Sequence, residues 1–330
     1  MRAIRIEQWC TPDALRVVDV SMPQCSREQV LIQVRAVPVT FSLWLLIQGK
    51  YQRKPTLPFI PGSFVAGEVV ECGKDATRFR PGNRVIAALD TGGCAEYVAA
   101  PQLNTYAIPD ALPFDRANAL NTAYSATLAA LTWPHMLGIT SGQQLLVLGA
   151  AGGVGTAALE IGGILGATVI AAASTAPKRA WASRHGATHV VEAEPSTLRD
   201  RVMAVTGGDG VDAVLDPVGG ALFNEALRCL KPEGRLATVG FASGEIPNIP
   251  ANLLLVKNIV VCGLNMNHYK VSAGKRHESR VRALFETLGH WYEEGRIDPA
   301  IAARFPLEQA PKAFATVLDR GHLGHVALIP

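Results

Sequence analysis

Charged residues are scarce in this chain of 330 residues: they make up 18% of it, while the hydrophobic set reaches 48%. That balance excludes an intrinsically disordered protein. No run of Lys or Arg is longer than two residues and the formal net charge is only +3, so we expect no nucleic-acid partner. No apolar run reaches the roughly 20 residues of a membrane span, and the alternating start of the chain is unlike a signal peptide. The composition predicts a cytoplasmic protein without a membrane partner, of one large domain or two.

Metal-binding motifs are also missing. No His-Glu-x-x-His occurs, and no two cysteines form a Cys-x-x-Cys pair. None of the eight histidines lies at ligand spacing from a cysteine. Because intracellular proteins keep their thiols reduced, we expect free, mostly buried cysteines and no bound metal. The cysteines are Cys10, Cys25, Cys72, Cys94, Cys229 and Cys262.

Glycine, by contrast, is abundant, and the chain has two textures. Up to about residue 115, short alternating runs between Pro-Gly and Gly-Gly turns, such as 29–37, 64–71 and 84–89, predict a barrel-like or sandwich fold. Beyond it, apolar strands alternate with helical stretches, which indicates a doubly wound parallel sheet. The expected strands are 143–149, 168–173, 189–192, 211–215, 234–240 and 259–263; helices at 278–294 and near 307–318 and a strand at 326–329 follow.

A glycine-rich turn lies between the first strand of this second part and the helix that follows it. The turn runs from Gly149 to Gly155. Small residues are needed at such a place because a pyrophosphate must approach the backbone and accept N–H groups at the helix N-terminus. We therefore predict a dinucleotide site, with contacts from Ala150, Gly152, Gly153 and Val154.

The end of the second strand indicates which dinucleotide is bound. An NAD site carries an acidic residue about 20 residues beyond the glycines, where it binds the ribose hydroxyls. Here no Asp or Glu lies between Thr168 and Lys178. Ser174 leaves room for a 2′-phosphate, and Lys178 and Arg179 supply two cations to neutralise it. The alternative is that both cations are ordinary solvated helix residues, but the missing acid favours NADPH.

Many short motifs, in a fixed order over nearly the whole chain, resemble the medium-chain dehydrogenase/reductase family. Within it, the chain is similar to the zinc-independent quinone oxidoreductase, or zeta-crystallin-like, branch. A long series of motifs is far more specific than any one of them. The motifs are Gly49-Lys50-Tyr51, Pro61-Gly62-Ser63, and the segments 81–85, 93–97, 150–155, 216–220, 226–230, 234–236, 239–244 and 250–258.

The resemblance implies a discontinuous layout. A β-rich, GroES-like catalytic domain would comprise residues 1–118 and 266–330, and a dinucleotide-binding Rossmann domain residues 119–265, with the active cleft between them. It also implies a homodimer, formed through the edge strand of the apolar run Leu253–Gly263. The further cofactor contacts that it implies are Thr122, Gly240, Phe241, Ala242 and Asn265.

The resemblance also implies catalytic residues. Tyr51 matches a tyrosine that serves as a candidate proton donor in related enoyl reductases, although a packing role at the rim of the cleft is equally compatible with its position. Thr40 is the hydroxyl that stands where the family has an asparagine, and Leu43 replaces the family's aspartate. His268 and His325 lie where other family residues have changed, and they are alternative proton-transfer groups; a loop or surface role is the simpler interpretation.

The residues at the family's zinc site suggest the type of reaction. Its alcohol dehydrogenases have Gly-His-Glu where this chain has Gly62-Ser63-Phe64. Without a zinc electrophile, the acceptor must already be polarised, as quinones and α,β-unsaturated carbonyl compounds are. We therefore expect an NADPH-dependent reductase of such small molecules. An enoyl-thioester reductase, with Arg53-Lys54 at its entrance, and a nucleotide-binding protein with little catalysis stay open as alternatives.

Overall fold

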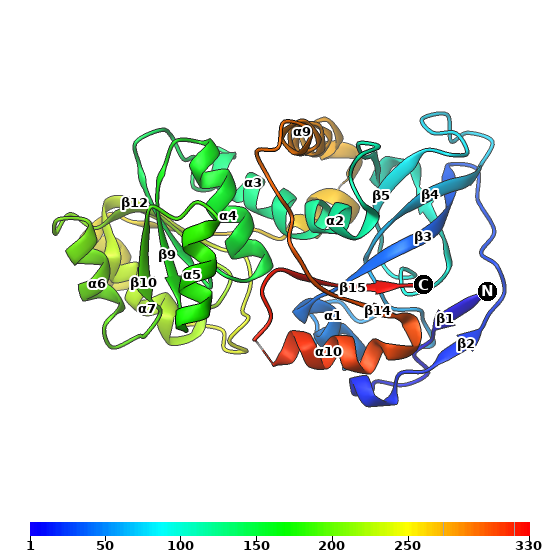
Figure 1. The fold of residues 1–330 in the computed structure, drawn as a ribbon, viewed down its shortest axis with the longest axis horizontal. Coiled ribbons are helices and arrows are strands. Elements are labelled where there is room, and N and C mark those ends of the chain that lie inside the picture. Colours follow the sequence, from blue (N-terminus) through cyan, green and yellow to red (C-terminus); the bar gives the residue numbers. More distant parts are fainter. Residues whose placement is uncertain (273, 320) are drawn as a thin grey trace. The chain divides into compact units, whose positions relative to one another are not determined.

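The computed structural model describes residues 1–272, 274–319 and 321–330 (Figure 1). The chain divides into two compact units: Met1–Thr122 together with Asn267–Pro330, and Ala123–Met266. The first is rich in antiparallel strands and the second is built on a parallel sheet. Within the part of the chain that the structure describes, no helix combines the length and apolarity needed to cross a membrane.

A six-stranded parallel sheet forms the centre of the second unit. Its strands lie in the order β10-β9-β8-β11-β12-β13, and every neighbouring pair is parallel. The chain starts in the middle, winds outward to β10, crosses back and winds outward to β13, which confirms the doubly wound Rossmann fold. The strands are β8 (Gln144–Leu148), β9 (Thr168–Ala173), β10 (His189–Glu192), β11 (Val211–Asp216), β12 (Leu230–Thr238) and β13 (Val260–Gly263).

Helices cover both faces of this sheet because its strands are apolar on both sides. Leu146 of β8 shares a core with Phe223 of α7 on one face. On the other face, a side chain at Gly162 of α4 would touch Leu145 and Val169 of β8 and β9. The helices of the unit are α3 (Ser125–Thr132), α4 (Gly153–Ile164), α5 (Ala176–Arg184), α6 (Leu198–Val205), α7 (Gly220–Cys229) and α8 (Ala251–Lys257).

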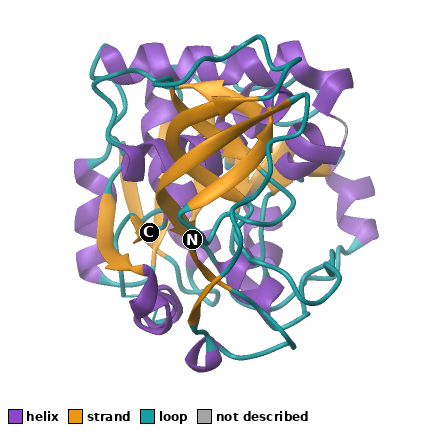
Figure 2. Cartoon of the chain, turned by 90° about the vertical axis from the view of Figure 1, so that its right-hand side faces the viewer, coloured by secondary structure: helices purple, strands orange, loops and turns teal. Residues whose placement is uncertain are grey.

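A strongly curved sheet forms the first unit, as Figure 2 shows. Its strands follow the order β14-β15-β3-β4-β5-β7, and β6 also pairs with β3. Register shifts along the β3–β4 pair bend these long strands. β1 (Arg2–Ile4) and β2 (Val17–Asp19) form a separate pair; the sheet strands are β3 (Gln29–Val39), β4 (Phe64–Cys72), β5 (Arg84–Ala88), β6 (Tyr97–Pro101), β7 (Thr105–Ala107), β14 (Ile301–Pro306) and β15 (His325–Ile329).

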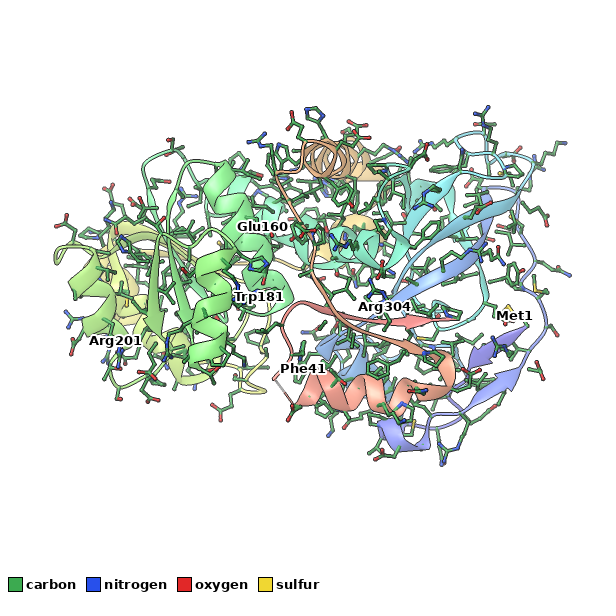
Figure 3. The ribbon with its side chains drawn as sticks, viewed as in Figure 1. Met1, Phe41, Glu160, Trp181, Arg201 and Arg304 are labelled. Atoms are coloured by element: carbon green, nitrogen blue, oxygen red, sulfur yellow. The ribbon has the colours of Figure 1, made fainter. Side chains whose placement is uncertain are left out.

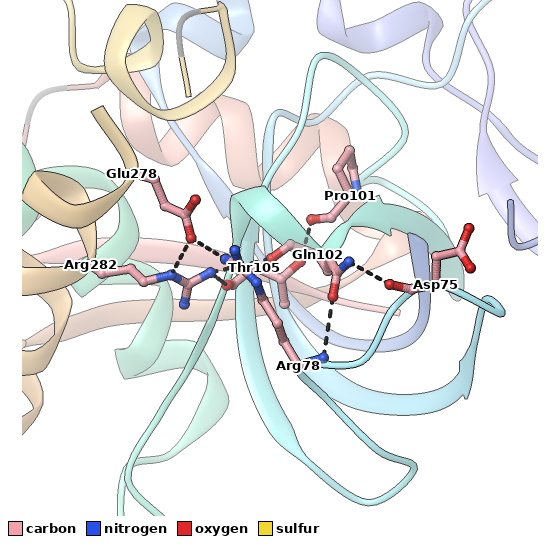
Figure 4. Close-up of polar contacts among 7 residues, drawn as sticks. All are labelled: Asp75, Arg78, Pro101, Gln102, Thr105, Glu278 and Arg282. Atoms are coloured by element: carbon pink, nitrogen blue, oxygen red, sulfur yellow. Dashed lines mark hydrogen bonds and ion pairs between the residues drawn. The ribbon is translucent and has the colours of Figure 1, made fainter. Parts of the chain in front are cut away.

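A network of hydrogen bonds and ion pairs connects the long helix α9 to the β-rich part of this unit (Figure 4). Glu278 of α9 accepts hydrogen bonds from Arg78 and, at 3.0 Å, from Arg282. Arg282 also approaches the carbonyl oxygens of Gln102 and Thr105 at 3.5 Å. The helices are α1 (Phe41–Ile47), α2 (Phe114–Ala119), α9 (Gly274–Glu293) and α10 (Ala310–Leu318), with π-helices at His268–Ser272 and at Leu120–Tyr124, where the boundary between the units falls.

Several elements differ from the expectation. The sequence predicted neither α1 nor β14, and it left the helical segment Phe114–Thr132 undefined. The residues of β14 did not predict a strand by themselves. β14 is defined by its parallel pairing with β15. β12 begins at Leu230 rather than at Gly234, since Leu230 already pairs with Val211 ahead of an irregularity in the ladder.

Candidate functional site

The glycine turn lies between β8 and α4, and its geometry requires small residues. Gly149 has a φ of 59°, which glycine adopts without strain. The N–H of Ala150 donates to the carbonyl oxygen of Ala172 in β9 at 3.2 Å. A Cβ at Gly155 would overlap the carbonyl oxygen of Gly149 and lie 2.6 Å from the Cα of Ala150. Only glycine at this position lets the helix begin so close to the end of the strand.

The N-terminus of α4 offers free backbone donors. Gly152 is the N-cap and has no side chain with which to satisfy them. Gly153 and Val154 form the first turn, whose N–H groups have no partner within an α-helix. Around a Cβ placed on Gly152, the nearest atom is the carbonyl oxygen of Gly149 at 3.4 Å, so the backbone is accessible. Open N–H groups and the helix dipole together favour an anion.

Polar and cationic side chains follow β9. Ser174 is exposed directly after the strand, and Lys178, in the first turn of α5, is partly exposed. Nη1 of Arg179 donates to the carbonyl oxygen of Ser174 at 3.2 Å. The same atom lies 3.5 Å from the carboxylate of Glu192, the last residue of β10. Lys178 and Arg179 therefore flank the end of β9, but Arg179 already has an acidic partner that the sequence did not reveal.

A buried carboxylate organises the next turn along this edge. Asp216 ends β11, is fully buried, and accepts two backbone N–H groups of the following turn at 2.7 and 2.9 Å. Burial raises the pKa of this carboxyl. The turn Gly240–Ala242 after β12 packs on that loop, since its last N–H donates to the carbonyl oxygen of Pro217 at 3.0 Å. The sequence placed Asp216 in a family motif without a role; here it shapes the support for Phe241.

All of these groups share one edge of the parallel sheet. The strands point the same way, so the segments after β8, β9, β11 and β12 emerge together at their carboxyl ends, where ligands of such sheets bind. Asn265 follows β13 at the same edge and is exposed. Thr122 belongs to the first unit, and its hydroxyl donates to the carbonyl oxygen of Asn118 at 2.9 Å.

Thr40 is the N-cap of α1. Its Oγ1 accepts the N–H of Leu43 at 3.1 Å and lies 2.9 Å from the hydroxyl of Ser42. This cap starts a helix whose residues Leu43 and Ile47 are buried. The hydroxyl that stands in the family's asparagine position therefore has a structural task, and a catalytic role would be additional to it.

Tyr51 lies after α1 and packs partly buried against the core of the β-rich unit. Burial raises the pKa of its phenol, so the hydroxyl stays protonated at neutral pH. Arg53, two residues on, forms an ion pair with Asp90. That pairing occupies one of the two cations that an enoyl-thioester channel would use.

The structure also reveals a buried lysine that sequence reasoning missed. Lys270, in the π-helix that precedes α9, is 1% exposed. Its Nζ donates to the carbonyl oxygen of Asn121 and, at 3.3 Å, to the Oδ1 of the same residue. It also lies 5.2 Å from the ring centres of Phe64 and Phe285. Burial lowers the pKa of this amine to about 7, and its partner directly precedes Thr122.

The two histidines that the sequence raised as alternatives differ in their surroundings. His268 is exposed and lies beside Tyr269, with ring centres 5.3 Å apart. Burial, followed by the neighbouring His322, lowers the pKa of His325 to about 4. His325 is therefore neutral at pH 7 and carries no proton to donate as an imidazolium.

All six cysteines are free, as expected from the sequence, but the expectation that most of them are buried is wrong, because four are only partly buried. Two are buried, and burial raises the pKa of Cys94 and of Cys229 to about 12, which makes both unreactive at neutral pH. Among the residues that the structure describes, no group of three or more His, Cys, Asp or Glu side chains is placed to hold a metal ion.

Comparisons with known proteins agree with this architecture. The alcohol dehydrogenase GroES-like domain matches residues 26–110, and the zinc-binding dehydrogenase family model matches residues 153–282. The quinone oxidoreductase-like protein 2 homolog of Nematostella vectensis is 36% identical over 303 residues, which are 91% of this chain and 81% of that protein.

Two solved structures that were determined in complex with NADPH are similar over 100% of both chains. A mycobacterial protein has a TM-score of 0.91 at 30% identity. The quinone oxidoreductase of Escherichia coli has a TM-score of 0.91 at 25% identity. Fold, motifs and relatives agree, and the chain belongs to the quinone oxidoreductase branch of the medium-chain dehydrogenase/reductase family of oxidoreductases.

Proposed function

We infer that this protein reduces quinones or α,β-unsaturated carbonyl compounds with NADPH, by hydride transfer that does not use zinc. The observation that carries the cofactor assignment is the edge of the parallel sheet. There, a glycine-capped helix N-terminus stands beside β9, which is followed by Ser174, Lys178 and Arg179 and by no acidic residue up to Lys178. The relatives solved with NADPH support the same choice.

The residues present fit a dinucleotide phosphate. A pyrophosphate needs backbone N–H groups that no side chain shields, and Gly153 and Val154 present them. The N–H of Gly152 donates to the carbonyl oxygen of Gly149 at 3.0 Å, so Gly152 would contribute by its lack of a side chain. A 2′-phosphate needs hydroxyl and cationic donors, which Ser174, Lys178 and Arg179 supply. In the proposed complex, Gly240–Ala242, Asn265 and Thr122 are further contacts.

Bound NADPH supplies a hydride from its dihydronicotinamide ring. The acceptor takes that hydride at one atom and a proton at another, so the protein must orient it and stabilise the negative charge that develops. Tyr51 suits this task, because burial keeps its phenol protonated and able to donate. Thr40 provides a second hydroxyl at the start of α1, held by its capping bond to Leu43.

The proposed independence from zinc rests on what stands at the family's ligand positions. Ser63 replaces a histidine, and its hydroxyl donates to the carbonyl oxygen of Asp90 at 3.2 Å. Phe64 replaces a glutamate, and its ring lies beside the ammonium of Lys270. Both positions carry side chains that are poor zinc ligands and that contact other residues of the protein.

We also propose a twofold dimer. β13 is the last strand at its side of the parallel sheet, and an unpaired edge favours association with another chain. Large apolar side chains are exposed around it: Leu255 is 79% exposed, Val256 76% and Val260 45%. Pairing of two β13 edges would cover these side chains.

A panel of acceptors tests the proposed reaction. Purified protein is assayed with NADPH and with NADH against ortho- and para-quinones, enones and enoyl-CoA esters. The proposal expects oxidation of NADPH by quinones or enones, at a rate that a chelator leaves unchanged. Turnover of enoyl-CoA esters alone would establish the thioester alternative, and turnover of none of the acceptors would overturn the proposal.

A further inference from the structure

An acidic side chain lies beside the proposed 2′-phosphate site, where it would be expected to repel the ligand. Glu192 ends β10, and the parallel register pairs it with Ala173, the last residue of β9. Ser174 follows directly. The acid that is missing after β9 is thus supplied by the neighbouring strand, and phosphate binding requires that its charge be compensated.

Two arginines compensate that charge. Arg201 of α6 binds one carboxylate oxygen of Glu192 through Nη2 at 2.8 Å, and Arg179 of α5 lies 3.5 Å from the other through Nη1. Arg201 is itself oriented, because its Nε donates to Oγ1 of Thr197 at 3.0 Å. Figure 3 shows Arg201 on α6 in the parallel-sheet unit. The carboxylate therefore bridges two helices.

The pairing of Glu192 with Arg179 and Arg201 affects how much positive charge is available to bind the phosphate. Lys178, Arg179 and Arg201 carry three positive charges, against one negative charge on Glu192. Arg201 holds Glu192 more closely than Arg179 does, so Arg179 keeps donors that are not committed to the carboxylate. Without Arg201, Glu192 would keep its contact with Arg179 and would neutralise the cation that the phosphate needs.

We propose that Arg201 is a specificity-determining residue: by holding Glu192, it leaves Arg179 free to bind the 2′-phosphate and so sets the preference for NADPH over NADH. Arg201 acts through its neighbours and is a positioning residue. The inference rests on the proposed cofactor, and it adds an element, β10–α6, that the glycine turn and the β9 segment do not contain.

The decisive measurement is the dissociation constant of NADPH and of NADH, by nicotinamide fluorescence titration at fixed ionic strength. Arg201→Ala should raise the dissociation constant of NADPH about two- to fivefold, the range of an exposed ion pair, and leave that of NADH unchanged. The effect should shrink at high salt, because exposed charges are screened.

Arg199→Ala is the matched control. It removes the same charge from the same helix, but Arg199 pairs with Asp200 at 3.7 Å and not with Glu192. It should leave both affinities unchanged. The double variant Glu192→Gln/Arg201→Ala should restore NADPH binding, because the acid that Arg201 restrains is then gone; this recovery is the coupling that a double-mutant cycle isolates.

The outcomes separate the inference from the function on which it rests. Equal affinity of the wild type for NADPH and NADH overturns both. A preference for NADPH that Arg201→Ala leaves intact, or that Arg199→Ala lowers by as much, overturns the role of Arg201 alone. A double variant that binds NADPH as weakly as Arg201→Ala also overturns the role of Arg201. Unchanged NADH binding in each variant shows that the site is still folded.

Discussion

Replacing Lys270 with methionine removes a buried amine while keeping a side chain of similar length. The Nζ of Lys270 donates to Asn121, and burial lowers the pKa of the amine from its ordinary value of 10.5 to about 7. The ring centres of Phe285 and Tyr106 lie 4.2 Å apart, and Arg282 lies over the ring of Tyr106. The variant should therefore change how the stability of the protein depends on pH.

The magnitude follows from the size of the pKa change. Between pH 7 and 10.5, the folded protein binds fewer protons at Lys270 than the unfolded chain does, so its stability rises with pH in that window. Below pH 7 the whole cost of burying the charge is present, about 5 kcal/mol at 1.36 kcal/mol per pKa unit. From pH 6 to pH 8.5, Lys270 alone should add about 2 kcal/mol to the free energy of unfolding.

Urea unfolding of the wild type and of Lys270→Met at pH 6, 7 and 8.5 measures this difference. The window ends below the ordinary thiol pKa of 9.0, above which thiols such as Cys94, whose pKa burial raises to about 12, begin to act in the opposite direction. Lys50→Met, at an exposed lysine of the same unit, is the control and should keep the wild-type pH dependence. Equal pH dependence in the wild type and in Lys270→Met would show that burial does not lower the pKa of Lys270 in the folded protein.

Variants at four further positions test the site and the assembly. Lys178→Ala should erase most of the preference for NADPH, since a charged hydrogen bond contributes about 1.5–3 kcal/mol, and a titration with both cofactors measures it. Tyr51→Phe should lower kcat for enones by about 10²–10⁴-fold with little change in NADPH affinity, whereas quinones, whose products take protons from water, should be affected little. Thr40→Ala should cost about 1 kcal/mol of stability through the lost helix cap, and Thr40→Ser should retain it, as thermal unfolding will show. Leu255→Asp should shift sedimentation at micromolar concentration from dimer to monomer, and a monomeric wild type would contradict the proposed dimer.

The sequence predicted the fold of the parallel-sheet unit because residues that lie close together in the chain mark each of its strands and helices. Each strand is a short apolar run, and glycines such as Gly149 and Gly166, both with positive φ, mark where strands and helices end or begin. The glycine turn likewise predicted its own geometry, because the close approach at Gly155 leaves room for no other residue.

The remainder depends on partners that are distant in the sequence. α1 is apolar on most of its surface, and its cap, Thr40, was interpreted only through the family's asparagine. The residues that neighbour Lys270 in the sequence do not predict its burial, because the groups that enclose it come from β4, α9 and the segment at Asn121. The charge of Glu192 likewise reaches the end of β9 only through the pairing of two strands.

Single-turnover oxidation of NADPH tests whether the protein transfers a hydride to quinones or enones without zinc. Protein loaded with NADPH is mixed in a stopped-flow instrument with a quinone or an enone, and the loss of nicotinamide absorbance is followed, with NADPH deuterated at the transferred position as the comparison. We expect oxidation that depends on the acceptor and the enzyme, is slower with the deuterated cofactor, and persists in zinc-free protein. An absence of acceptor-dependent oxidation, or oxidation that appears only after zinc is added, would contradict this expectation.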